Sequence, residues 1–201
     1  PPDSGIRRHN IALTAGFHCQ AENVTGHIFL KDFLPCNRLA YKVFYRRLYR
    51  YCDAIHYPTQ FIRDVFENVV GPTPGHVISN GVGREFLASA AEAPASDRPP
   101  YTVLFAARYS PEKSHQILID AAALSRHRDE LRLVFAGRGP QEDAIVRRAR
   151  RRHIPAPVMR FYSREELIEV IRGADLYVHP AEIEIESIAC LEAIACGRVP
   201  L

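Results

Sequence analysis

The chain has 201 residues, of which 47% are hydrophobic and 24% are charged, and its formal net charge is +3. This composition is typical of a globular protein and excludes disorder over most of the length. The small positive charge does not by itself predict nucleic-acid binding, although it suits an anionic ligand or an anionic membrane surface.

The first half of the chain alternates short apolar runs with helical patterns. Strands are expected over residues 11–17, 54–57 and 76–79, and helices over 37–52 and 59–68. In the longer helix, Ala40, Phe44, Leu48 and Cys52 form an apolar stripe, and the cations at positions 38, 42, 46 and 50 lie on the opposite side. An Ala-, Ser- and Pro-rich stretch at 87–100 then predicts a linker between two domains.

The second half predicts a parallel sheet covered on both faces. Continuous apolar strands are expected at 102–107, 131–136, 158–162 and 175–179, and helices at 115–126, 141–153, 164–172 and 187–196. In such sheets ligands bind at the carboxyl ends of the strands. Candidate site residues are therefore sought directly after these strands.

Two cations, Arg108 and Lys113, follow the first of these strands. They suit a diphosphate, whose negative charge grows as it departs. The alternative is a solvated turn in which one cation pairs with Glu112. After the next strand, Gly137 and Gly139 allow a ligand to approach the backbone, although a glycine pair at a strand–helix turn is usually only a turn.

Three glutamates follow the last strand, and Glu192 is surrounded in sequence by apolar residues. A carboxylate among apolar residues needs a hydrogen-bond partner, and the paired hydroxyl groups of a ribose or hexose could donate to it. The alternative is that these glutamates face water or pair with arginines. His18 follows the strand at 11–17, and its position alone does not distinguish a structural from a catalytic histidine.

Taken together, these motifs resemble family-four retaining glycosyltransferases of the GT-B fold. Glu184 and Glu192 match the E-x7-E signature, which continues into L-E-A-x-A-C-G, and Arg108 and Lys113 match R-x4-K. Residues 136–140 match A-G-x-G-P, residues 77–82 are similar to V-I-P-N-G-V, and residues 16–18 resemble the histidine turn of the acceptor domain. The resemblance spans residues 16–197 and implies an α/β fold with two Rossmann-like domains, both truncated.

The resemblance implies a role for each matching residue. The catalytic candidates are His18, facing the reacting sugar, and Glu184, contacting it. The donor-binding candidates are Arg108 and Lys113 on the diphosphate, Glu192 on the ribose, and the glycines and helix start that flank them: Gly137, Gly139, Ser187 and Ile188. In place of the family's common G-F-G, residues 185–187 read Ile-Glu-Ser, a difference expected to bear on the identity of the sugar.

The implied domains are part of an acceptor-binding domain at 1–86, the linker at 87–100, and an incomplete nucleotide-sugar-binding domain at 101–201. Compared with the family, the start of the first domain and the end of the second are expected to be missing, so the chain is expected to be an internal fragment. The implied reaction is transfer of a hexose from a nucleoside diphosphate sugar with retention at the anomeric carbon.

The expected acceptor is a lipid or a glycan of the cell envelope. The basic, aromatic stretch from Arg38 to Tyr51 predicts either an anionic membrane surface as a partner or a solvated helix. No nucleic acid partner and no cofactor are expected, and without a D-x-D motif no obligatory metal either. Five cysteines without a C-x-x-C pair predict reduced thiols, and a cytoplasmic location follows. The alternatives are a non-catalytic nucleotide-binding module and a sugar-nucleotide epimerase.

Overall fold

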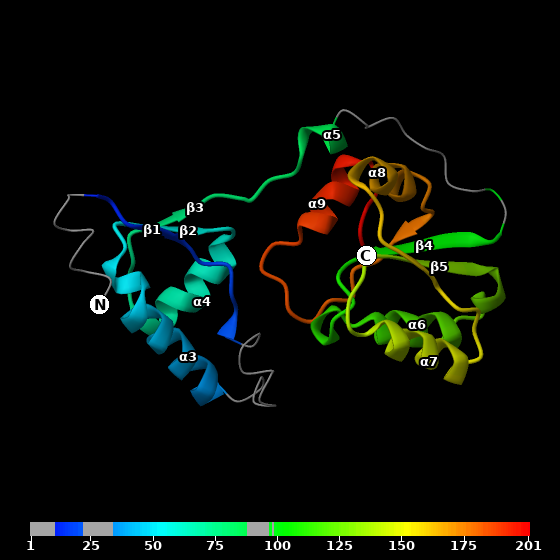
Figure 1. Ribbon diagram of the computed structural model, residues 1–201, viewed down its shortest axis with the longest axis horizontal. Helices are drawn as coiled ribbons and strands as arrows, with labels where there is room; N and C mark the ends of the chain where they lie inside the picture. The colour runs from blue at the N-terminus through cyan, green and yellow to red at the C-terminus, as the bar shows by residue number, and fades with distance from the viewer. Residues whose placement is uncertain (1–10, 22–33, 88–96, 98) are drawn as a thin grey trace. The chain divides into compact units, whose positions relative to one another are not determined.

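The computed structural model describes residues 11–21, 34–87, 97 and 99–201, and it divides the chain into two compact α/β units (Figure 1). The first unit runs to Asn80 and also takes in Ile183–Glu186, and the second comprises Gly81–Glu182 and Ser187–Leu201. The boundary between the two units therefore lies at Gly81, which comes before the linker expected at residues 87–100. Each unit is described by itself below.

The first unit contains a parallel three-stranded sheet in the order β1-β2-β3, with β1 at Thr14–Gly16, β2 at Ala54–Tyr57 and β3 at Gly75–Val77. Helices α3 (Leu34–Arg47) and α4 (Gln60–Val70) pack on it. Phe66 of α4 lies at the centre of an aromatic core, with its ring centroid 4.2 Å from that of Phe17. Thr59 caps α4 by accepting a hydrogen bond from the backbone N–H of Ile62.

The helix expected over 37–52 ends earlier, at Arg47. Leu48 leaves the helical conformation, and Tyr49–Tyr51 form a 3₁₀ turn. Tertiary packing explains the break, because the Tyr49 hydroxyl donates to the carbonyl of Gly16 (3.0 Å) and its ring lies 5.1 Å from Phe17. Leu48 is consequently 39% exposed, so the predicted apolar stripe is wrong at this position.

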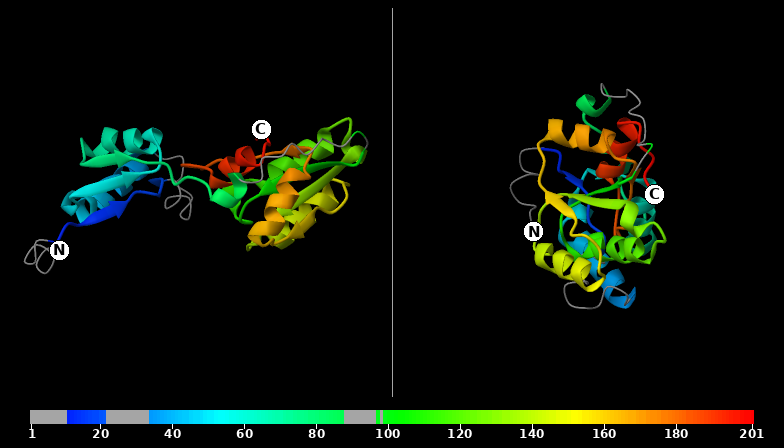
Figure 2. Two further views of the ribbon diagram at one scale, coloured as in Figure 1. Left: turned by 90° about the horizontal axis from the view of Figure 1, so that it is seen from above. Right: turned by 90° about the vertical axis from the view of Figure 1, so that its right-hand side faces the viewer.

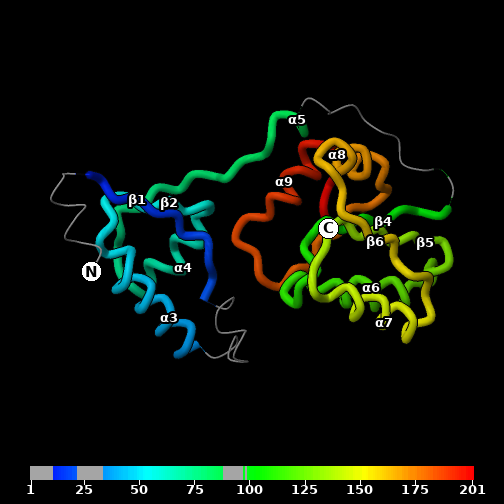
Figure 3. Tube along the Cα trace, viewed as in Figure 1, coloured from blue at the N-terminus to red at the C-terminus, as the bar shows by residue number. Residues whose placement is uncertain are grey.

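The second unit contains a parallel sheet in the order β6-β5-β4-β7. Figure 3 traces the chain of this unit through β4, β5 and β6. Its strands are β4 (Tyr101–Ala106), β5 (Leu131–Ala136), β6 (Val158–Arg160) and β7 (Leu176–Tyr177). The helices are α5 (Arg84–Leu87), α6 (His115–Leu124), α7 (Glu142–Arg151), α8 (Arg164–Arg172) and α9 (Ile188–Ala195). Short 3₁₀ turns, η4 (Pro111–Lys113) and η5 (Arg128–Glu130), precede α6 and β5.

Alternating residues of β4 and β5 face two separate cores. Leu104 and Val134 pack with α8 and α9, whereas Val103, Phe105 and Phe135 pack with α6 and α7. Figure 1 and the right-hand view of Figure 2 agree with this division, since α6 and α7 lie on one side of the sheet and α8 and α9 on the other. The expected parallel sheet with helices on both faces is confirmed in this unit.

The five cysteines at positions 19, 36, 52, 190 and 196 are all described, and none of them forms a disulfide bond. Among the residues described, no helix has the length and apolar character required to cross a bilayer.

Candidate functional site

The strand order of the second unit reverses between β4 and β7. The chain builds outward from β4 to β5 and β6, and then returns to place β7 on the other side of β4. The loops that follow β4 and β7 lead to helices on opposite faces, and such a switch point is where open α/β sheets bind ligands. The two loops are joined, because the backbone N–H of Glu182 donates to the carbonyl of Glu112 at 3.0 Å.

Arg108 lies in the loop after β4 with its side chain 71% exposed. One of its N–H groups donates to a carboxylate oxygen of Glu112 (3.1 Å), which also accepts from the Ser110 hydroxyl (2.6 Å). Burial would raise the pKa of Glu112, but the hydrogen bonds from Ser110 and Arg108 outweigh it and lower this pKa. The ion pair considered from the sequence is thus present, and the exposed guanidinium has further donors for a ligand.

Lys113 ends the turn formed by residues 108–113. Its backbone N–H donates to the carbonyl of Ser110 (3.1 Å), and the residue is half-buried. The turn therefore has an internal hydrogen-bonded framework that carries both candidate cations.

Gly137 and Gly139 lie in the loop after β5, and the structure gives them a packing role. A Cβ at Gly137 would lie 2.0 Å from the carbonyl oxygen of Ala107, and a Cβ at Gly139 would lie 2.5 Å from that of Tyr109. The position that a Cβ would occupy at either glycine is therefore already filled by the backbone of the neighbouring loop. The backbone N–H of Tyr109 also donates to the carbonyl of Arg138 (3.1 Å). The loop after β5 therefore supports the loop that carries Arg108.

The start of α9 is the third part of this edge. Ser187 caps the helix by accepting a hydrogen bond from the N–H of Cys190 (3.2 Å), and its hydroxyl also pairs with Nε2 of His179 at 3.2 Å. Ile188 is the first residue of the helix and is exposed. A capped N-terminus on the α9 side of the switch point offers a positive dipole end to an anion.

Glu192 is half-buried in the middle of α9. Burial raises the pKa of its carboxyl, the nearby Glu85 acts in the same direction, and Arg164 opposes them. Arg164 itself is paired with Glu85 at 2.6 Å. Within the described part of the chain, the Glu192 carboxylate has no hydrogen-bond or ion-pair partner, so it is open to donors from a ligand.

The two catalytic candidates, His18 and Glu184, belong to the first unit. His18 follows β1 with its ring 5.1 Å from that of His56, at an interplanar angle of 67°. The sequence does not show that these histidines are close, because only the β1–β2 register, which pairs Gly16 with His56, brings their rings together. The signal that could have predicted this contact is that each of two neighbouring parallel strands has a histidine at its carboxyl end.

Glu184 lies in the Ile183–Glu186 segment, which is bound within the first unit. Ile185 packs against that unit's aromatic core, and its carbonyl accepts from the Thr59 hydroxyl at 3.4 Å. The Glu186 carboxylate accepts from both the backbone N–H (2.8 Å) and the side-chain amide (2.7 Å) of Asn80. The residue that replaces an aromatic of the family pattern therefore anchors this segment.

Comparison with solved structures identifies the same fold in glycosyltransferases. TarM of Staphylococcus aureus, in a structure with UDP, superposes with a TM-score of 0.74 at 18% identity, covering 95% of this chain and 36% of TarM. HepE of Anabaena, also with UDP, gives a TM-score of 0.71 at 16% identity, covering 97% of this chain and 54% of HepE. The α/β fold with parallel sheets flanked by helices thus matches GT-B structures.

The sequence comparisons agree. EpsF of Bacillus subtilis (strain 168), which carries a provisional glycosyltransferase name, is 30% identical over 132 residues, covering 61% of this chain and 34% of EpsF. The chain thus matches about a third of that relative. The family model for glycosyl transferases group 1 matches residues 89–201, more than half of the chain. The chain therefore belongs to the glycosyl transferases group 1 family.

Proposed function

We propose that this chain is part of a retaining glycosyltransferase that moves a hexose from a nucleoside diphosphate sugar to a lipid or glycan acceptor of the cell envelope. The observation that carries the donor site is Glu192, a half-buried carboxylate with a raised pKa and no partner among the described residues. Its helix starts at the switch point where the 108–113 turn also lies.

In this proposal Arg108 and Lys113 hold the diphosphate, and the first turn of α9 at Ser187 and Ile188 adds its dipole. These three interactions with the diphosphate become more favourable as negative charge grows on the departing phosphate. Fixed positive charges lower the activation free energy of the transfer in this way. Glu192 accepts hydrogen bonds from the ribose hydroxyls. Membership of the glycosyltransferase family favours this reaction over an epimerase or a non-catalytic module.

Glu184 and His18 complete the proposal in the first unit. Glu184 contacts the transferred sugar, and His18 faces the reacting carbon, with His56 packed against its ring. The anchor between Glu186 and Asn80 holds the segment that carries Glu184. Catalysis is then mainly positioning and charge stabilisation, with the leaving phosphate accepting the proton of the incoming hydroxyl.

Calorimetric titration of UDP, GDP and ADP tests the donor site. One nucleotide is expected to bind, and Arg108→Ala or Glu192→Gln is expected to weaken it by about tenfold, since each removes a charge-assisted hydrogen bond. Matched controls are Arg150→Ala and Glu165→Gln, which alter exposed residues of α7 and α8. Equal affinity in all five proteins, or no binding of any nucleotide, contradicts the proposal.

A metal is not required in the proposed reaction, because the chain has no D-x-D motif. Transfer activity of the whole protein is expected to survive treatment with EDTA. Loss of activity with EDTA and recovery with Mn²⁺ would contradict this part of the proposal.

The lipid acceptor draws support from the exposed surface of α3. Leu39 (59% exposed) and Val43 (45%) lie among the exposed cations Arg38, Lys42 and Arg46, a mixture that suits the inner face of an anionic membrane. Flotation with vesicles of phosphatidylglycerol and phosphatidylcholine is expected to recover the protein, and vesicles of phosphatidylcholine alone are not. Equal recovery with both would remove this support and leave a soluble glycan as the acceptor.

A further inference from the structure

His115, the first residue of α6, is buried without a hydrogen-bond partner. The residue is 2% exposed, and neither ring nitrogen has a partner among the described residues. Its ring is surrounded by aromatic side chains, with centroids 4.5 Å from Phe105 and 5.1 Å from both Tyr109 and Phe135. Buried polar atoms are almost always paired, so two unpaired nitrogens on one ring call for a partner that the protein does not supply.

The imidazole is neutral at physiological pH. Burial lowers its pKa to about 4, the positive charge of Lys113 acts in the same direction, and Glu112 opposes them weakly. A neutral imidazole has one N–H donor and one acceptor nitrogen. The missing partner must therefore both accept and donate hydrogen bonds.

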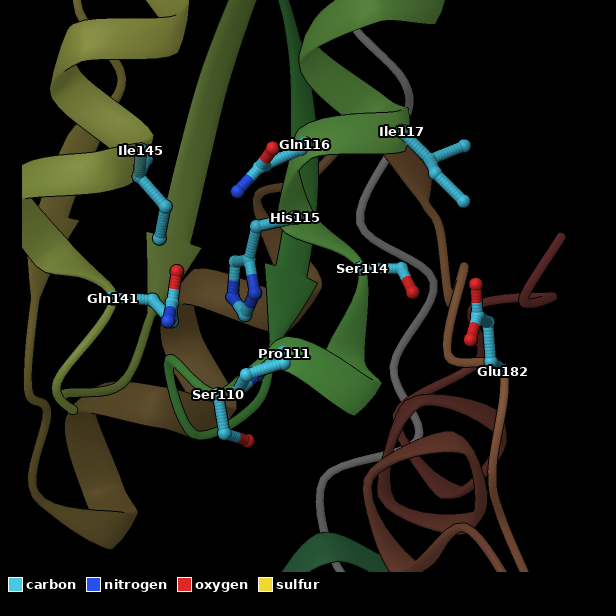
Figure 4. A pocket seen from close by; sticks show the side chains of 9 residues that line it. All are labelled: Ser110, Pro111, Ser114, His115, Gln116, Ile117, Gln141, Ile145 and Glu182. Atoms are coloured by element: carbon cyan, nitrogen blue, oxygen red, sulfur yellow. The ribbon is translucent and has the colours of Figure 1, made fainter. Parts of the chain in front are cut away.

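His115 lines a pocket of about 240 Å³ between the beginnings of α6 and α7. Figure 4 shows its ring extending toward Gln141, with the side chain of Gln116 directed into the space beside Ile145. One water occupies about 30 Å³ in the liquid, so the pocket has room for several waters or for one small ring. It is slightly smaller than the pockets that hold drug-sized ligands.

The chemistry of the lining indicates the class of ligand. Ser114, Gln116 and Gln141 carry hydroxyl or amide groups that can each donate and accept, as can the neutral ring. The Ser110 hydroxyl already donates to Glu112, so it is available as an acceptor. Among the residues that the structure describes, the pocket lining includes one glutamate and neither lysine nor arginine, so an inorganic anion is disfavoured. Pro111, Ile117 and Ile145 add apolar surface. Hydroxyl groups on a hydrocarbon ring match this combination.

We propose that this pocket is a binding site for a neutral, hydroxyl-rich ligand of monosaccharide size, additional to the candidate donor site. None of the candidate donor-binding residues lines it. The pocket nevertheless shares the 108–113 turn through Ser110, so both sites rest on the same framework. The inference stands on the His115 nitrogens and the pocket, and it does not depend on the proposed reaction.

NMR of the chain with ¹⁵N-labelled histidine tests the proposal, with glucose, galactose and glycerol as probes. His115→Phe identifies the ring signals by their absence. A sugar is expected to shift the His115 nitrogen signals in a saturable manner. Gln141→Leu removes an amide from a half-exposed lining residue. It is expected to weaken the binding of the sugar by about threefold to tenfold, which is the effect of losing one neutral hydrogen bond.

Two controls separate this pocket from the donor site. Glu142→Gln alters the exposed neighbour of Gln141 and is expected to leave sugar binding unchanged. Glu192→Gln is expected to retain the sugar-dependent shift, and Gln141→Leu is expected to retain nucleotide binding. Three outcomes overturn the proposal: no probe shifts the His115 signals, so that the pocket holds only water; inorganic phosphate shifts them and sugars do not; or Glu192→Gln abolishes the shift.

Discussion

The buried imidazole of His115 predicts a specific loss of stability in acid. In the unfolded chain this histidine has an ordinary pKa of 6.5, whereas burial lowers it to about 4 in the folded protein. Between these values the unfolded chain binds a proton that the folded chain does not, so acid favours unfolding. The contribution of a neutral His115 is fully present above pH 6.5 and is lost progressively as the pH falls toward 4.

The size of this effect follows from the two pKa values. Each pH unit between 6.5 and 4 removes about 1.4 kcal/mol from the free energy of unfolding, so the loss is about 3 kcal/mol over the full interval. His115→Phe places an apolar ring among Phe105, Tyr109 and Phe135 and removes the titration. Its free energy of unfolding is therefore expected to fall less steeply with pH than that of the wild-type chain.

Urea unfolding followed by far-UV circular dichroism measures this difference, since the chain contains no tryptophan for fluorescence. Curves at pH 7, 6, 5 and 4.5 are compared for the wild type, His115→Phe and a control, His127→Gln, whose side chain is 59% exposed. Hydrogen exchange in β4 assigns the effect to the second unit. Parallel pH profiles for the wild type and His115→Phe would refute the reasoning and mean that water reaches the ring freely.

Three further changes probe other contacts of the fold. Gly139→Ala places a Cβ 2.5 Å from the carbonyl oxygen of Tyr109, so it is expected to displace the loop and weaken nucleotide binding at least tenfold in calorimetry, with the circular dichroism spectrum retained. Asp120→Asn removes the carboxylate that accepts from two arginines at the end of α7, which is expected to lower the Tm by a few degrees, and by less in high salt. Glu186→Ala frees the amide of Asn80, whose hydrogen exchange is expected to become about tenfold faster.

Several elements were predictable because their burial is local in sequence. The expected strands at 54–57 and 131–136 and the expected helix at 164–172 match β2, β5 and α8. The last begins with a capping box between Ser163 and Glu166, which is encoded by neighbouring residues. The strand expected at 11–17 shortens to Thr14–Gly16, because only these residues pair with β2.

Other features depend on contacts that no local pattern encodes. To predict the packing of His18 on His56, one must know the register of two strands. To predict that a Cβ at Gly137 or Gly139 would clash, one must know the path of a separate loop. The assignment of Glu184 to the first unit is of the same kind, since it rests on contacts with residues more than 100 positions away. The nine histidines of the sequence likewise do not reveal that the ring of His115 is enclosed by three aromatic rings.

The strand order explains why the sequence could nevertheless place the candidate donor-site residues at one edge of the sheet. In a parallel sheet every loop after a strand lies at the same edge, so cations after one strand and a helix start after another are expected there without knowledge of the order. The order β6-β5-β4-β7 then makes β4 and β7 neighbours, and the bond from Glu182 to Glu112 joins their loops. Arg108 and the start of α9 are therefore held at one switch point by the topology, whereas the glycines act by packing. Nucleotide affinity should accordingly respond to Gly139→Ala through displacement of the Arg108 turn, and to Arg108→Ala through the loss of charge.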